Sequence, residues 1–377
     1  MIVLPPLSLY IHIPWCVKKC PYCDFNSYTT KGIIPEFQYI NALIYDLKND
    51  LYLINNRTIK NIFIGGGTPN LLNYTSIQYL LDNINKYIFI SNTAEITIEM
   101  NPDLVTIDTL LAYIELGINR ISLGIQSFNN RLLKLIGRKH TSESVIKIFQ
   151  KIKNKKININ IDLMYGLPEQ TLEECLYDLK QAILMNPKHI SWYQLSIEKN
   201  TIFYIKKNNF PNDNIIWDMY NQGNNLLRTS KYIRYEISAY SKKKYQCQHN
   251  LNYWKFGDYI GIGCGAHGKI TQKNGDIIRI IKKNKISEYI NSQKYIQKKY
   301  KILNQDKPCE YFMNVFRLFK PIKRKYFKLY TGLNEDYIQE NINQLIQKKY
   351  IMQTEKYWYT LPKGKNFLNN LLEYFIK

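Results

Sequence analysis

The sequence predicts an α/β fold in which a partial (β/α)6 barrel of the TIM type precedes a small helical domain. Short β-branched runs alternate with longer amphipathic stretches over the first two-thirds of the chain, as in parallel strands joined by helices. Six such units are present, three-quarters of the eight in a complete barrel. Polar and glycine-rich motifs follow the strand ends, where such barrels carry their chemistry.

The predicted elements alternate regularly up to the sixth strand. Strands are expected at Leu7–Ile13, Asn61–Ile64, Glu95–Met100, Arg120–Ile125, Ile157–Leu163 and His189–Ser196. The intervening helices are expected at Pro35–Ile54, Ser76–Tyr87, Ile107–Leu116, Asn130–Ile136, Glu143–Lys153 and Leu172–Met185. A helix at Asp213–Thr229 and a strand at Tyr232–Ile237 follow.

From about Asp306 the pattern changes to that of a compact, winged-helix-like cap. Helices are expected at Pro308–Phe319 and Asn334–Lys348, a β-hairpin at Tyr350–Leu361 and a last helix at Gly364–Ile376. We therefore divide the chain into a barrel, a glycine-rich connecting segment and a C-terminal helical domain, at residues 1–240, 241–300 and 301–377.

Composition limits the class of protein. With 45% hydrophobic and 14% aromatic residues, the 377-residue chain can bury a sizeable core, which excludes global disorder. No apolar run is long enough to span a membrane, and the start, Met1 to Pro6, does not resemble a signal peptide. Seven cysteines, three of them in one loop, fit metal ligation in a reducing compartment. We expect a cytoplasmic protein.

The net charge of +22 raises the alternative of a nucleic-acid partner. However, the lysines are scattered among Asn, Ile and Tyr, as in the stretches 151–160 and 295–301. This pattern indicates a compositional bias rather than a binding face. An RNA-binding or RNA-modifying protein would rest on charge alone, and we expect no nucleic acid.

Cys16, Cys20 and Cys23 form the most informative motif. Thiolates are soft ligands for iron–sulfur clusters or zinc. Three cysteines leave one iron of a [4Fe–4S] cluster open to an exchangeable ligand. Structural zinc requires four protein ligands, which His12 could complete only from a strand that fixes its direction. Three unliganded cysteines are the other alternative.

The stretch from Tyr10 to Phe25 resembles the signature of the radical S-adenosylmethionine (SAM) superfamily, C-x3-C-x2-C with an aromatic residue, Tyr22, before the last cysteine. The resemblance implies a [4Fe–4S] cluster on the three cysteines and SAM at the open iron, which the superfamily cleaves reductively to a 5′-deoxyadenosyl radical. We include Tyr10 and Tyr22 among the cofactor-binding residues. Within the superfamily, the stretch is similar to oxygen-independent coproporphyrinogen oxidases and their relatives, the HemW haem chaperones.

Motifs at four further strand ends point to the SAM site. Glycines after the second strand let the backbone approach a ligand closely. A carboxylate and an amide at adjacent strand ends point into one mouth, an arginine can hold a carboxylate bidentately, and an aspartate can accept ribose hydroxyl groups. Capping of the barrel rim, or a surface location for the arginine, is the alternative. The resemblance implies that the SAM contacts are Gly66, Gly67, Thr68, Glu99, Gln126, Arg138 and Asp162.

The segment Gly261–Gly268 superficially resembles a dinucleotide-binding fingerprint. No strand–turn–helix unit with a following acidic residue supports that interpretation, and we reject it. A close approach of its backbone to a ligand near the barrel mouth is expected instead.

Two features separate the oxidases from the chaperones. The oxidases carry a fourth cysteine where this chain has Phe25, and a longer stretch ahead of the signature than the fifteen residues here. The segment His249-Asn250-Leu251-Asn252-Tyr253-Trp254 resembles the H-N-x-x-Y-W motif of the HemW proteins, in which the histidine is associated with haem. A loop histidine beside a docking aromatic pair is the alternative, and Cys247 is a weaker candidate contact.

These features lead to the hypothesis of a haem chaperone that carries a [4Fe–4S] cluster and SAM and passes haem to an acceptor protein. A coproporphyrinogen III oxidase is the second hypothesis. The acceptor is unidentified, and a membrane-associated protein is one alternative for it. Productive cleavage of SAM, the covalent or non-covalent state of haem, and a monomeric or dimeric state stay open.

Overall fold

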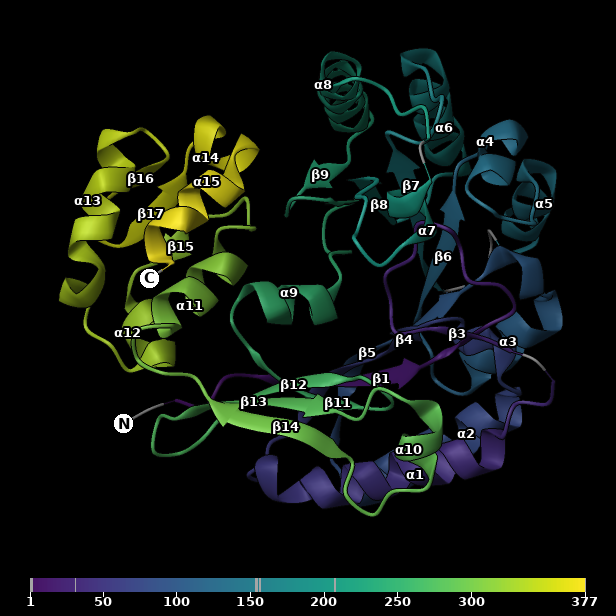
Figure 1. Ribbon diagram of the computed structural model, residues 1–377, viewed down its shortest axis with the longest axis horizontal. Coiled ribbons are helices and arrows are strands. Elements are labelled where there is room, and N and C mark those ends of the chain that lie inside the picture. The colour runs from purple at the N-terminus through teal and green to yellow at the C-terminus, as the bar shows by residue number, and fades with distance from the viewer. Residues whose placement is uncertain (1–2, 31, 153–154, 156, 207, 377) are drawn as a thin grey trace.

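Six parallel strands form the body of the molecule, which is seen here as a computed structural model that describes residues 3–30, 32–152, 155, 157–206 and 208–376 (Figure 1). In the sheet they lie side by side in chain order: β1 (Leu7–Ile13), β4 (Ile59–Gly66), β5 (Ile90–Met100), β6 (Arg120–Gln126), β7 (Asn158–Tyr165) and β8 (His189–Gln194). Each neighbouring pair is parallel. The predicted partial barrel is confirmed.

Helices pack on the outside of this sheet and bury the outer face of the strands. They are α1 (Glu36–Asp50), α2 (Tyr74–Tyr87), α3 (Ile107–Glu115), α4 (Asn130–Leu135), α5 (Ser142–Ile152), α6 (Leu172–Met185) and α8 (Asp213–Thr229). Each lies within two residues of its predicted start. Helix α6 begins with a capping box between Thr171 and Glu174, which satisfies two of the free backbone N–H groups. Lys153, at the end of the predicted helix Glu143–Lys153, lies outside the described residues.

Four strands that were not predicted from the sequence extend the sheet beyond β1. They are β11 (Asp258–Ile262), β12 (His267–Thr271), β13 (Ile277–Lys282) and β14 (Ile296–Lys301). Strand β11 is parallel to β1, and the next three follow it as antiparallel neighbours. Part of the segment that we interpreted as a connection therefore belongs to the same hydrogen-bonded sheet. The boundaries proposed at residues 240 and 300 stay a prediction.

At the opposite edge, the predicted strand Tyr232–Ile237 is shorter than expected. It consists of β9 (Ile233–Arg234), which turns back to pair with β10 (Ala239–Ser241), and β10 pairs with β8. The strands described in this sheet number twelve.

The C-terminal residues form a separate hydrophobic cluster, which confirms the predicted small helical domain. Its three-stranded sheet consists of β15 (Ile322–Lys323), β17 (Tyr357–Thr360) and β16 (Ile351–Gln353), and its helices are α11 (Lys307–Val315), α12 (Lys325–Thr331), α13 (Gln339–Gln347), α14 (Pro362–Asn366) and α15 (Leu368–Leu372). Phe312 stacks on Phe316 and Phe375 at its centre. Within the described ranges, no helix combines the length and the apolar character needed to traverse a bilayer.

Helix α9 (Gln248–Trp254) lies between this domain and the sheet (Figure 1). It contacts β1, β4 and β11 on one side and α11 on the other. The H-N-x-x-Y-W segment therefore forms a helix at the junction of the two parts rather than a surface loop.

A buried cluster of charged residues connects strand β13 to helix α1 of the barrel. Lys282 at the end of β13 forms ion pairs with Asp46 and Asp50 of α1, and all three side chains are almost completely buried. The Tyr289 hydroxyl donates to Asp46 at 2.7 Å. Burial raises the pKa of Asp46 to about 6, despite the neighbouring Lys282.

Replacing Lys282 with Met should therefore lower the free energy of unfolding by about 3–5 kcal/mol, because two carboxyl groups stay buried without a cation. Those carboxyl groups then have raised pKa values in the folded state, so the loss should be larger at pH 8 than at pH 5. Urea denaturation at both pH values measures it. Lys285→Met, which removes an exposed ion pair with Glu288, is the control and should change little. Equal effects of the two substitutions would contradict this account.

Candidate functional site

The cysteine loop begins where β1 ends and folds back on itself as a small two-stranded sheet of its own. Its two arms, β2 (Trp15–Cys16) and β3 (Tyr28–Thr29), pair with each other, and the N–H of Tyr28 donates to the carbonyl of Pro14 at 2.7 Å. A tight turn brings the N–H of Cys23 to the carbonyl of Cys20 at 3.1 Å. All three cysteines are half-buried, free of disulfides, and line one cavity of about 540 Å³.

Hydroxyl groups surround two of the thiols. The Thr68 hydroxyl donates to Cys16 Sγ at 3.5 Å, and Ser27 Oγ lies 3.9 Å from Cys23 Sγ. Burial raises the pKa of both thiols. Such hydroxyl groups would stabilise thiolate charge once a metal displaces the protons.

The histidine considered as a fourth zinc ligand is already engaged. His12 Nε2 lies 2.9 Å from the carbonyl oxygen of Asn26, and Nδ1 lies 3.0 Å from the Tyr10 hydroxyl. Among the residues that the structure describes, no three or more His, Cys, Asp or Glu side chains converge as ligands of a single metal ion. In a four-iron cluster each thiolate binds a different iron, so the thiols need not converge on one point.

The glycines at the end of β4 approach the end of β1 and the cysteine loop. A Cβ on Gly66 would lie 2.6 Å from the His12 ring, and one on Gly67 would lie 2.5 Å from the carbonyl oxygen of Trp15. The Gly67 N–H also donates to the carbonyl of Ile13 at 2.7 Å. Packing of the loop against β4 thus requires these glycines independently of any ligand.

The polar residues at the next strand ends are held in place by neighbours. Glu99 accepts a hydrogen bond from the Gly66 N–H at 3.1 Å. Asp162 accepts from the Ser122 hydroxyl and the Asn160 amide, both at 2.8 Å. The pKa of Glu99 is raised to about 7, mainly because the side chain is buried and to a smaller extent because the Asp162 carboxylate lies nearby.

Two further side chains complete this wall. Gln126 has a φ of 71°, unusual for a non-glycine residue, and its Oε1 accepts from the Tyr193 hydroxyl at 3.1 Å. Arg138 donates to the carbonyl of Gly124 at 3.0 Å. Its Nε is buried and has no hydrogen-bond partner among the described residues, although Arg138 lines the cavity. A donor in this situation suits an anionic ligand group.

The structure brings eleven of the thirteen predicted site residues around this one cavity. They are Cys16, Cys20, Tyr22, Cys23, Gly66, Gly67, Thr68, Glu99, Gln126, Arg138 and Asp162. Five residues that were not predicted from the sequence also line it: Ser122, Met164, Ser191, Tyr193 and Glu198. Tyr193 lies in the sixth predicted strand, so the strand-end rule could have identified it.

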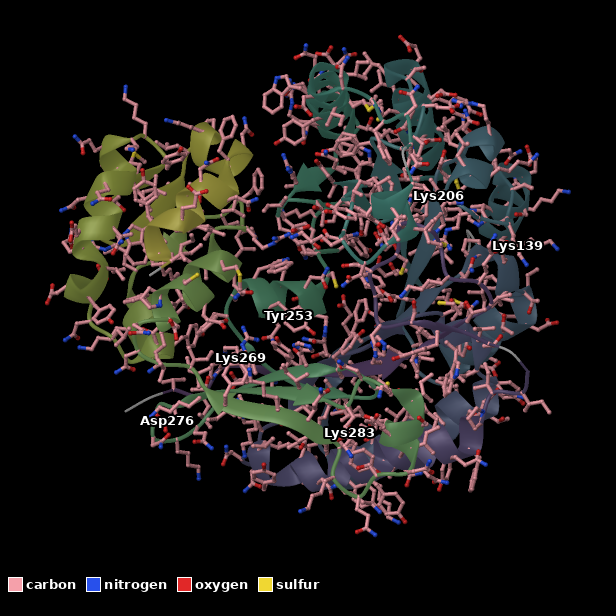
Figure 2. All side chains as sticks on the ribbon, viewed as in Figure 1. Lys139, Lys206, Tyr253, Lys269, Asp276 and Lys283 are labelled. Carbon is pink, nitrogen blue, oxygen red and sulfur yellow. The ribbon has the colours of Figure 1, made fainter. Side chains whose placement is uncertain are left out.

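Tyr10 and His249 lie outside this group. Tyr10 faces a second cavity of about 690 Å³, which adjoins the first because Phe25, Gly66 and Glu99 line both. The second cavity lies between the sheet, α9 and α11, where Tyr253 is seen near the centre of the molecule (Figure 2).

His249 is only 1% exposed and has partners on both ring nitrogens. Its Nδ1 lies 2.7 Å from Asn61 Oδ1, and its Nε2 lies 2.8 Å from the Tyr253 hydroxyl. Burial lowers the pKa of His249 to about 3, so the ring is neutral. Ligation of iron by His249 stays a prediction, and it requires the Tyr253 hydroxyl to leave Nε2. Cys247 is fully buried beside Glu95.

The close approach expected for Gly261–Gly268 is made to the end of β1 and to the cysteine loop. A Cβ on Gly263 would lie 2.5 Å from the carbonyl oxygen of His12, and one on Gly265 would overlap the Asn26 amide. Asn26 in turn donates to the carbonyl of Cys264 at 3.0 Å. This segment therefore supports the loop from the side opposite Gly66 and Gly67.

Comparisons with known proteins agree with this architecture. The family model of the radical SAM superfamily matches residues 10–182. The "Heme chaperone HemW" of Buchnera aphidicola subsp. Acyrthosiphon pisum is 56% identical over the whole of both chains, and that of Escherichia coli is 48% identical over the whole of both. The solved structure of Escherichia coli coproporphyrinogen III oxidase (HemN) superposes with a TM-score of 0.85 at 23% identity, over 99% of this chain and 90% of that one. At that identity the likeness shows the fold alone.

Proposed function

The chain belongs to the HemW haem chaperone family of the radical SAM superfamily, and we propose that it binds haem in the cytoplasm and transfers it to an acceptor protein. The observation that carries the proposal is the second cavity, which adjoins the cysteine-lined one. A volume of about 690 Å³ lies within the range for sites of small organic ligands and cofactors. Aromatic side chains on its wall suit a flat macrocycle.

We propose that Cys16, Cys20 and Cys23 hold a [4Fe–4S] cluster. The donor set fits, because three half-buried thiols share one cavity with neighbouring hydroxyl groups. When bound, such a cluster supplies an electron for reductive cleavage of SAM. The chain's own part would be to hold the thiolates and to limit the access of water.

SAM would lie in the same cavity, against the strand ends. Gly66, Gly67 and Thr68 line this cavity beside the cysteine loop. The buried Arg138 Nε suits the carboxylate of SAM, and Glu99 and Asp162 suit its cationic and hydroxyl groups. Tyr22 closes the wall next to the last cysteine.

The first prediction concerns the cluster. Replacing Cys16, Cys20 or Cys23 with Ala should abolish the broad visible absorption and the bound iron after anaerobic reconstitution, because each thiolate would bind a different iron. Cys309→Ala, at a half-buried thiol in α11, is the control and should keep both. Retention of about four irons per chain in the triple variant would refute the assignment.

The second prediction concerns Glu99 and pH. SAM carries positive charge, so binding favours the ionised carboxylate, and with a pKa of about 7 this form is lost as the pH falls. SAM should bind about tenfold more weakly at pH 6 than at pH 8, as measured by anaerobic titration calorimetry. Glu99→Gln should bind weakly at both pH values and lose the dependence. If SAM binding by Glu99→Gln keeps the same pH dependence, the prediction is wrong and another group, such as Asp162, causes that dependence.

The third prediction tests the function itself. The reconstituted chain should bind haem, shown by a Soret band that persists through gel filtration, and should deliver it to an apoprotein acceptor. It should not decarboxylate coproporphyrinogen III with SAM under reducing conditions, because Phe25 stands where the oxidases carry a fourth cysteine. Decarboxylation without stable haem binding would replace the chaperone proposal with the oxidase.

A further inference from the structure

The second cavity contains a histidine with properties different from those of the other four. His12, His140, His189 and His249 are all buried, and each makes at least one ring hydrogen bond. His267, at the start of β12, is exposed and lines the cavity. Within the part of the chain that the structure describes, its ring makes no hydrogen bond. It therefore offers a ring nitrogen to a ligand without breaking an existing contact.

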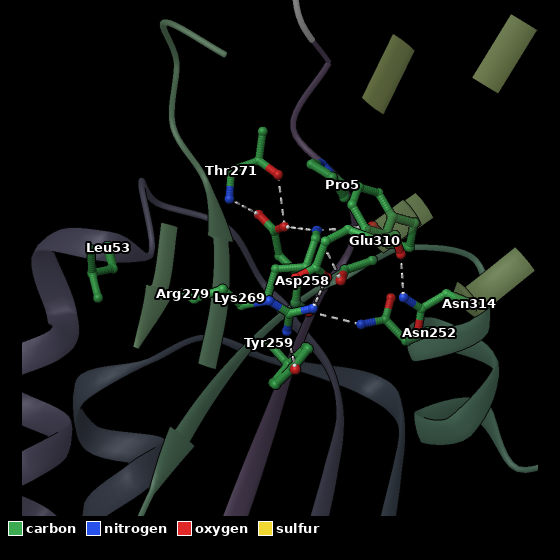
Figure 3. Close-up of polar contacts among 12 residues, drawn as sticks. Pro5, Leu53, Asn252, Asp258, Tyr259, Lys269, Thr271, Arg279, Glu310 and Asn314 are labelled. Atoms are coloured by element: carbon green, nitrogen blue, oxygen red, sulfur yellow. Dashed lines mark hydrogen bonds and ion pairs between the residues drawn. The ribbon is translucent and has the colours of Figure 1, made fainter. Parts of the chain in front are cut away.

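The protonation state of His267 also suits a metal. The pKa of His267 is lowered, mainly because the ring is partly buried and to a smaller extent because the Arg279 guanidinium lies nearby. The lowered pKa favours the neutral imidazole at neutral pH. Neutral imidazole is the form that binds haem iron. Arg279 and Lys269 lie side by side on β13 and β12, as their register in the sheet requires (Figure 3).

These two cations are held rigidly. Lys269 Nζ donates to Asp258 Oδ1 at 2.8 Å and to the carbonyl of Phe256 at 3.0 Å. Arg279 pairs with Glu310 of α11 and donates to the Tyr259 hydroxyl at 2.6 Å. The wall beside His267 is thus fixed in position, and the guanidinium of Arg279 reaches the cavity, where it suits a carboxylate of the ligand.

The remaining wall is mainly aromatic. Tyr253 and Trp254 come from α9, and Phe25 comes from the cysteine loop. Phe25 is 56% exposed although it is a large apolar side chain, and it lies at the boundary with the first cavity. An aromatic wall with one free imidazole and an arginine at one end suits an iron porphyrin with carboxylate side chains.

We propose that haem binds in the second cavity with His267, rather than His249, as the axial ligand of its iron. This inference rests on the proposed function, since it identifies the residue by which this chaperone would hold its cargo. His249 then has a structural role: together with Asn61 and Tyr253 it fixes α9 against β4, and Tyr253 faces the cavity.

The test titrates two porphyrins into the reconstituted chain and its variants. Haem contains iron and can accept an axial ligand, whereas metal-free protoporphyrin IX has the same shape and carboxylates without the metal. In His267→Ala, the dissociation constant for haem should rise tenfold or more and the Soret band should shift. Affinity for protoporphyrin IX, measured by fluorescence, should stay within about twofold of the wild type, since only the iron bond is lost. His267→Gln, which keeps a polar side chain of similar length, should behave like His267→Ala.

The controls separate the possible failures. His249→Gln, which can keep hydrogen bonds to Asn61 and Tyr253, should leave the Soret band in place. If the Soret band shifts in His249→Gln and not in His267→Ala, His249 is the ligand and the inference is overturned. An equal loss of both porphyrins in His267→Ala would make His267 a packing residue and would also overturn it. If the wild-type chain binds no haem, the proposed function fails first, and this inference fails with it.

Discussion

The cysteine loop and the end of β1, from which it emerges, are held in position by glycine contacts that leave no room for a side chain. Gly67, which follows β4, meets the loop at Trp15, and Gly265, in the turn after β11, meets it at Asn26. Gly66 and Gly263 meet His12 at the end of β1. These glycines belong to segments nearly two hundred residues apart, and both strands pair with β1, from which the loop emerges. Closing the sheet around β1 therefore fixes the positions of the thiols. The extension by β11 to β14 is part of this construction, because without β11 one side of the loop would be unsupported.

The interior beneath the first cavity is polar, which is costly unless every group has a partner. Asp162, Ser122 and Asn160 form a hydrogen-bonded group, and His189 continues it through Asn160 to Tyr235. This network reaches the strand ends without a mobile loop, so the side chains that face the cavity are positioned in advance of any ligand. The buried Arg138 Nε stands apart from it as a donor without a partner in the described chain, which is the arrangement expected where a ligand completes the site.

Much of the barrel and of the first cavity could be predicted from the sequence, because both depend on local patterns. The predicted bounds of the strand Leu7–Ile13 match the observed ones, because an apolar run that is buried on both faces is a strong sign of a parallel strand. Strand β14 was missed because an edge strand with the sequence IQKKYK is exposed at five of six positions, and such lysines make it look like solvated chain. The environment of His249 depends on Asn61, 188 residues away, which a local motif does not reveal. His267 lies within the glycine-rich segment Gly261–Gly268, but its exposure to the cavity depends on the position of β12 in the folded sheet.

The two cavities share a wall, and this has a consequence for how the site would work. Glu99 and Gly66 face both cavities and are joined by a hydrogen bond of 3.1 Å, while Phe25 covers the boundary from the cysteine loop. A ligand that moves Glu99 on one side would alter the wall on the other side, so the free energies of binding at the two sites should be coupled, and the coupling must be reciprocal. A cysteine at position 25 would instead place a thiol at this boundary. The exposed phenyl ring of Phe25 offers a surface for stacking at the boundary between the two cavities. This wall therefore suits the binding of a macrocycle better than the catalysis of a reaction on the macrocycle.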